Sequence, residues 1–345
     1  MEAPSYIKGV LSLPGMKIPV IETHWNFNDR VGAMKVRWGI GRNSYKVAPK
    51  LYAVGSPDRN SRVFVTSNYK LTFDHVKAAL HGLDAWLLVL ETKGVNVWCA
   101  AGKKTFGSKE LINRINLTQL DQVVDHRKLI LPQLGAVGIA AHEVLLATGF
   151  HVIYGPVQAK DIHQFLQSGL KASEEMRRIR FPLWERLKVI PVDIFYGKYY
   201  LIMVPALFLL LSGAGKDGYN IDLAVEKGWR AVINLYCGYL AGCVLGPILL
   251  PWIPFRRFSL KGMVTGLIVA IVLMFAGNLG NQPLQVISWF LMITGISSFM
   301  AMNFTGSSTF TSLSGVQKEM KTALPVQIAA AALGLITFIV TLFLS

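Results

Sequence analysis

One cysteine of this chain stands where a thiol could do chemistry. The three cysteines, Cys99, Cys237 and Cys243, form no C-x-x-C pair and no plausible disulfide framework, and the last two lie inside an apolar run. Cys99 stands in the stretch GVNVWCAAGKKTFGSKEL, beside a tryptophan and among small residues that leave room around the sulfur. A free cysteine is usually a small buried hydrophobe, whereas a thiolate in a ligand-binding loop can be a nucleophile or a ligand for a soft or late transition metal. Both interpretations stay open on the residues alone.

The elements around Cys99 alternate between predicted strands and helices. The segments RVFVTSN, AWLLVLET, DQVV, KLILPQL and FHVIYGPV predict strands, and LTFDHVKAALHGL, FGSKELINRI, VGIAAHEVLLATG and AKDIHQFLQSG predict helices. Such alternation is typical of a mostly parallel sheet that binds ligands at the carboxyl ends of its strands. The polar turns TSNY, GVNVWCAAGK, PQLGA and YGP should therefore share one face, with Cys99 in the second of them.

Several other functions are not indicated. No G-x-G-x-x-G follows a first strand and no G-x-x-x-x-G-K-[ST] occurs, so neither a dinucleotide nor a nucleoside triphosphate is signalled. His142 and His151 are read as ordinary helix and strand residues. Residues 1–62 contain strand-like stretches and basic residues, which we interpret as a solvated or lipid-facing surface with no nucleic acid partner.

Composition divides the chain into a basic front and an apolar back. The 345 residues have a mean hydropathy of +0.41 and are only 16% charged, which indicates membrane spans. Residues 1–190 carry 26 lysines and arginines against 15 acidic residues. Runs free of charge extend over 199–215, 231–255, 262–317 and 322–345. A span needs about 20 apolar residues, so the long third run predicts two helices turned at GNLGNQP, and five spans in all.

The charges also predict an orientation. Basic residues lie before the first span, between the second and third spans, and between the fourth and fifth spans. Because lysine and arginine accumulate in cytoplasmic loops, we expect these three segments on the cytoplasmic side. The start of the chain lacks the pattern of a signal peptide. We therefore expect a multi-pass protein of the cytoplasmic (inner) membrane with its front half cytoplasmic and its C-terminus outside. No charged residue lies well inside a span, which favours an anchor or docking platform over a transport path.

The stretch NVWCAAGK closely resembles the signature of the HgcA family, the corrinoid proteins of the anaerobic mercury-methylation pair. The flanking TSNYKLTFD, LPQLGA, ATGF and YGPV resemble the same corrinoid domain, which is similar to part of the large subunit of the corrinoid iron–sulfur protein. The resemblance covers about residues 60–190. It implies an α/β Rossmann-like corrinoid-binding domain (63–180) and an all-α transmembrane domain of five helices (199–345). The residue pattern itself predicts an N-terminal β-rich part of the cytoplasmic domain (1–62) and a juxtamembrane linker (181–198).

The resemblance also implies a site. Cys99 would be the catalytic residue and the lower axial ligand of the corrinoid cobalt, held by a cap helix that Asn96 to Lys103 begin. The D-x-H-x-x-G motif of histidine-ligated corrinoid enzymes is absent, in agreement with a sulfur ligand. The residues expected to contact the corrinoid besides Cys99 are Thr66, Ser67, Asn68, Asn96, Val97, Trp98, Ala100, Ala101, Gly102, Lys103, Gln133, Leu134, Gly135, Gly149, Tyr154 and Gly155.

The implied activity is a corrinoid-dependent methyltransferase that forms methylmercury. A thiolate trans to the methyl group donates electron density to cobalt, which favours departure of the methyl as a carbanion equivalent toward Hg(II). The methyl donor would derive from methyltetrahydrofolate. Two electrons are needed per turnover, and the chain has no Cys-rich cluster motif, so a ferredoxin-like partner with two [4Fe–4S] clusters would supply them.

Two alternatives remain on the sequence. The nearer one is a corrinoid methyl carrier of one-carbon and acetyl-CoA metabolism without mercury chemistry. The other is a membrane-bound corrinoid sensor or uptake component that catalyses nothing.

Overall fold

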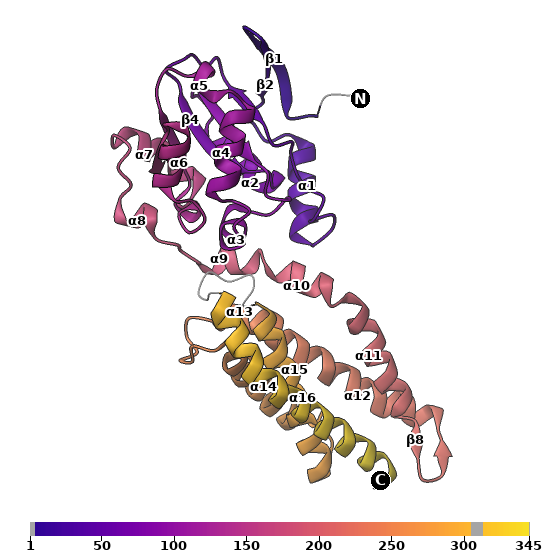
Figure 1. Ribbon diagram of the computed structural model, residues 1–345. Coiled ribbons are helices and arrows are strands. Elements are labelled where there is room, and N and C mark those ends of the chain that lie inside the picture. Colours follow the sequence, from indigo (N-terminus) through magenta and orange to yellow (C-terminus); the bar gives the residue numbers. More distant parts are fainter. Residues whose placement is uncertain (1–3, 305–312, 345) are drawn as a thin grey trace. The chain divides into compact units, whose positions relative to one another are not determined.

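The chain folds into two compact units, which are described separately. The computed structural model describes residues 4–304 and 313–344. Unit 1 is Met1–Arg180 and unit 2 is Phe181–Ser345 (Figure 1).

Unit 1 is built on one mixed seven-stranded sheet in the order β1-β2-β3-β5-β4-β6-β7. The four strands in the order β5-β4-β6-β7 are all parallel to one another. Strand β3 is antiparallel to β5, and β1 is antiparallel to β2. Successive strands are added on opposite sides of β4, so the sheet has a switch point between β4 and β6. The strands are β1 (Ile7–Leu13), β2 (Met16–Ile21), β3 (Leu51–Val54), β4 (Arg62–Ser67), β5 (Ala85–Leu90), β6 (Lys128–Leu131) and β7 (His151–Tyr154).

Helices cover both faces of this sheet, because alternate strand residues point to opposite sides. Val63 and Val65 of β4 pack in one core with the helices between 97 and 148, and Phe64 packs in the other core with Phe73 and Phe165. The helices of unit 1 are α1 (Phe27–Arg37), α2 (Lys70–Ala79), α3 (Val97–Gly102), α4 (Ser108–Leu117), α5 (Leu120–Val123), α6 (Ala141–Thr148), α7 (Ile162–Gln167) and α8 (Glu174–Arg177), with the short 3₁₀ turns η1 (Gln133–Gly135) and η2 (Ala159–Asp161).

Unit 1 differs from the sequence expectations in two details. Residues 1–62, expected to be a β-rich part of the cytoplasmic domain, contribute β1, β2 and β3 to the main sheet but also form helix α1 at residues 27–37. Asn26 starts this helix, since its side chain accepts from the Asp29 amide at 2.7 Å while Asp29 accepts from the Asn26 amide. The segment DQVV is helical rather than a strand, because Leu120 and Val123 are buried at helical spacing.

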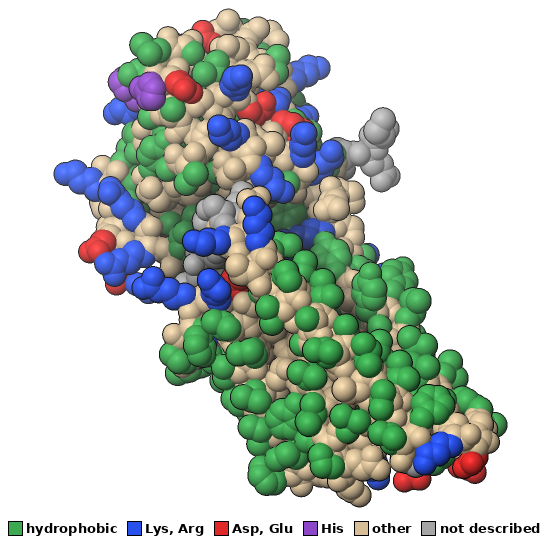
Figure 2. Space-filling model, turned by 60° about the horizontal axis from the view of Figure 1, so that its bottom comes forward, with side chains coloured by type: hydrophobic (Ala, Val, Ile, Leu, Met, Phe, Trp, Pro, Cys, Tyr) green, Lys and Arg blue, Asp and Glu red, His purple; other side chains and the backbone are tan. Residues whose placement is uncertain are grey.

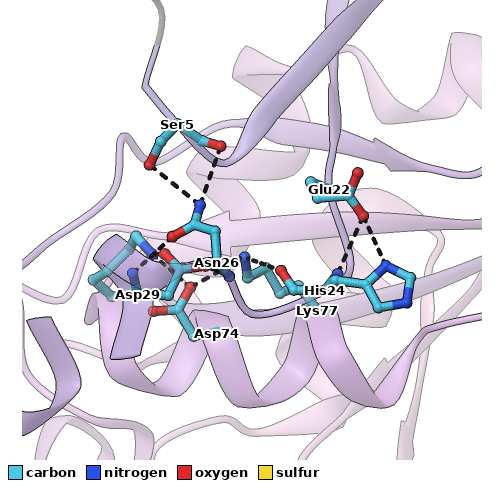
Figure 3. A network of polar contacts seen from close by, with 8 residues as sticks. Ser5, Glu22, His24, Asn26, Asp29, Asp74 and Lys77 are labelled. Carbon is cyan, nitrogen blue, oxygen red and sulfur yellow. Dashed lines mark hydrogen bonds and ion pairs between the residues drawn. The ribbon is translucent and has the colours of Figure 1, made fainter. Parts of the chain in front are cut away.

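A buried cluster of four charges joins α1 to α2 (Figure 3). The Lys70 ammonium lies 2.5 Å from Asp29 and 2.6 Å from Asp74, and the Lys77 ammonium lies 2.6 Å from Asp29. Burial opposes ionisation of Asp29, but hydrogen bonds from both lysines outweigh it and hold the pKa of Asp29 below its ordinary value. Burial raises the pKa of Asp74 to about 6. At neutral pH both carboxylates are therefore charged and depend on the two ammonium groups.

Unit 2 is helical and apolar. Figure 2 shows that hydrophobic side chains cover most of its visible face and that charged side chains lie near its ends. Its helices are α9 (Leu183–Leu187), α10 (Ile190–Tyr196), α11 (Lys198–Leu211), α12 (Ile221–Leu240), α13 (Gly246–Leu249), α14 (Phe258–Phe275), α15 (Pro283–Asn303) and α16 (Leu313–Leu344); a π-helical turn η3 (Ala241–Leu245) joins α12 to α13, and β8 (Ala214–Gly215) and β9 (Gly218–Tyr219) form a hairpin.

Four helical segments in the described part of the chain are long and apolar enough to cross a membrane: Ile221–Leu249, Phe258–Phe275, Pro283–Asn303 and Gly315–Leu344. The turn predicted at GNLGNQP separates the second from the third, as expected. A fifth span requires the pair Leu183–Tyr196 and Lys198–Leu211 to act together, although they are bent by 58°. The segment predicted as a linker, 181–198, is thus mostly helical, and the count of five spans stays a prediction.

Glycines bring the helices of unit 2 into backbone contact. Gly262 and Gly266 of α14 form a G-x-x-x-G pair, and a Cβ at Gly262 would lie 2.5 Å from the Ser297 carbonyl oxygen of α15. The Ser297 hydroxyl donates to the Gly262 carbonyl at 2.6 Å, and Thr265 and Ser297 are hydrogen-bonded to each other at 3.2 Å. Close backbone approach and interhelical hydrogen bonds are the contacts that associate helices in lipid, where hydrophobic burial has no driving force.

We predict that Gly262→Ala destabilises unit 2 by about 1–3 kcal/mol, because the added methyl overlaps backbone that cannot move freely. Thermal unfolding of the detergent-solubilised protein, followed by helical circular dichroism, measures the effect. Gly295→Ala is the matched control, since the nearest atom to its Cβ would be 3.6 Å away. Equal melting of the two variants would contradict the close packing.

We also predict that Lys77→Met lowers the free energy of unfolding of unit 1 by about 3–5 kcal/mol, because Asp29 and Asp74 would share one buried ammonium group. Denaturant unfolding of the full-length protein in detergent, followed by tryptophan fluorescence, tests this. The control is Lys109→Met on the exposed face of α4. A loss no larger than that of the control would show that the cluster does not stabilise the fold.

Candidate functional site

Cys99 lies in the short helix α3, directly after the carboxyl end of β5. The Asn96 side chain accepts a hydrogen bond from the Cys99 amide at 2.9 Å and caps the helix, which ends before Lys103. Helix α3 buries Val97 and Ala100 against the sheet, together with Ala101, and leaves Gly102 and Lys103 exposed. Trp98 and Cys99 are half-buried, and of these two residues Trp98 lines the cavity described below while Cys99 does not.

Small residues hold α3 against the turn that follows β6. A Cβ at Gly138 would lie 2.2 Å from the Phe106 carbonyl oxygen and 3.0 Å from the Ala101 Cα. A Cβ at Gly135 would lie 2.6 Å from the Phe106 ring. Gly135 was expected to contact the cofactor, but it is buried and packs against Phe106 instead, because this turn must approach the chain beyond α3 closely.

Asn68 fixes the loop that leads from β5 into α3. Its side-chain oxygen accepts from the Thr92 amide at 3.1 Å, the Thr92 hydroxyl at 2.8 Å and the Gly94 amide at 3.0 Å. Its amide nitrogen donates to Glu91 at 2.8 Å. Asn68 was expected to contact the cofactor directly, but it is fully buried and its polar atoms serve this loop. Its role is therefore to position α3.

An apolar cavity of about 340 Å³ opens at the switch point between β4 and β6. Of the expected contacts, Thr66, Asn96, Val97, Trp98 and Leu134 line it. The sequence interpretation missed the rest of the lining, which is Phe64, Val65, Thr72, His75, Val76, Ile130, Leu131, Pro132, Pro156, Val157, Ala159 and Ile162. The spacing of Thr72, His75 and Val76 by three and four residues was the available signal, since it places them on one face of α2.

Two buried hydroxyl groups lie at the carboxyl end of β4. Thr66 and Ser67 are fully buried, and neither hydroxyl oxygen has a hydrogen-bond partner among the described residues. An unsatisfied buried hydroxyl costs about 1–3 kcal/mol, so such groups commonly await a ligand or a water molecule. Thr66 also lines the cavity, and it can donate to a polar atom placed there.

The remaining expected contacts lie around the site or away from it. Tyr154 donates to the Ile139 carbonyl at 2.7 Å, and burial raises its pKa. Gly155 is buried, Gln133 is half-exposed in η1, and neither lines the cavity. Gly149 was wrongly placed in the site: with φ of 74° it ends α6 and precedes β7, which puts it at the opposite edge of the sheet.

Comparison with known proteins relates this site to corrinoid proteins. Residues 37–166 match the family model described as CO dehydrogenase/acetyl-CoA synthase delta subunit. The chain is 34% identical over 137 residues to the acetyl-CoA decarbonylase/synthase complex subunit gamma of Methanopyrus kandleri, which is 39% of this chain and 29% of that protein. It is 30% identical over 127 residues to the corrinoid/iron-sulfur protein large subunit of Moorella thermoacetica, which is 36% of this chain and 28% of that protein.

The matched family segment contains strands β3 to β7, helix α3 and the cavity. The predicted relationship to the large subunit of the corrinoid iron–sulfur protein is thereby confirmed. The chain spans less than a third of the length of these relatives. Unit 2 lies outside the matched segment, and the resemblance to the mercury-methylation pair stays a prediction.

We predict that Asn68→Ala loosens the loop before Cys99 without unfolding the sheet. Hydrogen–deuterium exchange of residues 91–103 should speed up, because three donors lose their common acceptor at a cost of about 1–3 kcal/mol for an unsatisfied buried group. The control is Asn116→Ala at an exposed position of α4. Unchanged exchange in this loop would mean that Asn68 does not position α3.

Proposed function

We propose that this chain is a membrane-anchored corrinoid protein of methyl transfer in which the Cys99 sulfur is the lower axial ligand of cobalt. The observation that carries the proposal is the position of Cys99. It is a half-buried thiol in a capped helix at the carboxyl edge of a parallel sheet, next to a cavity that Trp98 lines. The relatives named as corrinoid/iron-sulfur protein and as subunits of acetyl-CoA complexes support the cofactor class.

The residues present fit such a cofactor. The cavity of about 340 Å³ lies at the small end of the range for ligand pockets, so it suits a nucleotide base and leaves a whole corrin ring outside. If the Cys99 sulfur held the cobalt, the cofactor's own base would be free of the metal, and this apolar pocket would hold it. The unpartnered hydroxyl of Thr66 offers this pocket a hydrogen bond, while Val97 and Leu134 supply apolar walls.

When bound, the corrinoid supplies a transferable methyl group. The contribution of this chain is to hold the Cys99 sulfur in place through Asn96 and, one step further out, Asn68. Held as a thiolate, the Cys99 sulfur would donate electron density to the bound cobalt, which would favour departure of the methyl group with its bonding electrons. A soft electrophile is the natural acceptor for such a group, and together with the motif around Cys99 this makes Hg(II) our first candidate.

The proposal needs partners and a membrane. With three cysteines in all, the chain cannot supply four ligands to an iron–sulfur cluster, so electrons would come from a ferredoxin-like protein with two [4Fe–4S] clusters. The methyl donor would derive from methyltetrahydrofolate. The apolar helices of unit 2 would anchor the protein in the cytoplasmic membrane, with unit 1 cytoplasmic and the C-terminus outside.

A second candidate is a methyl carrier of one-carbon metabolism, which the comparisons favour. The relatives belong by name to acetyl-CoA decarbonylase/synthase complexes, and their similarity covers the sheet and the cavity. In this function the same site holds the same cofactor, and the acceptor is a carbon-metabolism partner instead of mercury.

The first test compares the optical and EPR spectra of the anaerobic, corrinoid-loaded protein with those of Cys99→Ala. We expect a sulfur-ligated cobalt signature that disappears in the variant, with Cys237→Ala as a control that keeps it. The same three proteins are then offered Hg(II), and methylmercury formation should be lost only in Cys99→Ala.

The outcomes separate the candidates. Identical spectra of wild type and Cys99→Ala would exclude the axial-ligand role. A sulfur signature with transfer of the methyl group to a carbon acceptor, and none to Hg(II), would identify the methyl carrier. Binding of corrinoid without transfer to either acceptor would leave a sensor or an uptake component.

A further inference from the structure

The outward face of α1 carries a stripe of apolar side chains. Phe27, Val31, Met34 and Trp38 follow one another at spacings of four, three and four, which places them on one face of the helix. Phe27 is 78% exposed, Met34 58% and Trp38 46%, while Val31 is half-buried. In a soluble domain this face would be polar. We refer to these four residues as the α1 stripe.

The stripe cannot turn inward, because the opposite face of α1 is fixed. Asp29 points into unit 1, where it is bound by Lys70 and Lys77 of α2 at 2.5 and 2.6 Å (Figure 3). Ala33 and Val36 are buried on the same side. Rotation of α1 would bring the Asp29 carboxylate out of this cluster and leave two buried ammonium groups with one partner fewer.

Basic residues flank the stripe on both sides. At 100° per residue, Arg30 and Arg37 lie along one side of it and Lys35 along the other. These three side chains make no ion pair with any acidic side chain of the described residues. An exposed apolar stripe between rows of unpaired cations is the arrangement of helices that lie in the interface of an anionic bilayer.

We propose that α1 is an interfacial helix: its stripe inserts among the acyl chains next to the headgroups of an anionic lipid bilayer, and Arg30, Lys35 and Arg37 bind lipid phosphates. The proposal rests on the membrane anchoring proposed above and not on the corrinoid chemistry. Charge complementarity favours anionic lipid over zwitterionic lipid. Because unit 2 ties unit 1 to the membrane, the bilayer is present at high effective concentration, and weak insertion of one short helix suffices.

Most of helix α1 also lies outside the segment that matches the family model. The family match begins at residue 37, so three of the four stripe residues precede it. A membrane contact is of use to a chain that carries its own apolar helices, and most of the stripe lies outside the matched segment.

Site-specific photocrosslinking in full-length protein tests the proposal. The photoreactive residue p-benzoylphenylalanine replaces Met34 in one variant and Leu117, which is 66% exposed on α4, in a matched control. Both are reconstituted in vesicles of phosphatidylcholine alone or mixed with phosphatidylglycerol, irradiated and analysed for lipid adducts by mass spectrometry. We expect several-fold more adduct at Met34 than at Leu117 in the mixed vesicles, and a drop in phosphatidylcholine alone.

Two further variants check the parts of the surface separately. Combining Met34→p-benzoylphenylalanine with Arg30→Gln or Lys35→Gln should lower the adduct about fivefold for each charge removed. Phe27→Ser should lower it in both kinds of vesicle, because the apolar contact is shared. Three outcomes would each overturn the proposal. The amount of lipid adduct could be equal at Met34 and Leu117, or the adduct at Met34 could be the same in both kinds of vesicle. In native membranes, the crosslink at Met34 could join a protein instead of lipid. Corrinoid spectra of the same variants should be unchanged, which separates a failure here from a failure of the proposed function.

Discussion

The hydrogen bonds of Asn68 are the constraint on which the candidate site depends. Asn68 directly follows β4, and its side chain binds the loop that follows β5. It therefore connects the carboxyl ends of two neighbouring parallel strands. The loop carries Asn96, and Asn96 in turn caps the helix of Cys99. The side chains of Asn68 and Asn96 therefore fix the helix of Cys99 relative to the sheet. No contact with a ligand is needed for this.

The two units are held together internally by different means. In unit 1 alternating strand residues bury apolar surface on both sides of the sheet, and four buried charges fasten α1. In unit 2 the apolar side chains face outward as well as inward, so specificity comes from glycine contacts and from hydroxyl groups such as that of Ser297. This difference is the one expected between a domain folded in water and helices packed in lipid, the environment proposed above for unit 2.

Much of unit 1 could be predicted from sequence periodicity. Strands β4 and β5 and helices α2, α4 and α6 follow from alternation or from apolar spacing by three and four. Helix α1 did not, because its largest apolar residues, Phe27 and Met34, face outward while its buried face carries Asp29. In the site, the helix around Cys99 followed from its motif. The support that Gly135 and Asn68 give to the backbone did not, because a loop position does not tell whether a residue faces a ligand or supports the backbone. The walls contributed by α2 depend on tertiary packing that loop motifs do not reveal.

The order of elements along the chain has a consequence for biosynthesis. The last strand of the sheet ends at Tyr154, and the first helix of unit 2 begins at Leu183. Helix α1 must wait until Lys77 has left the ribosome before Asp29 finds its partners, and both of these partners, Lys70 and Lys77, belong to unit 1. Unit 1 can thus complete its core while the apolar helices are still being translated, at about 5–20 residues per second. The membrane insertion proposed for unit 2 would therefore act on a chain whose preceding unit is already folded.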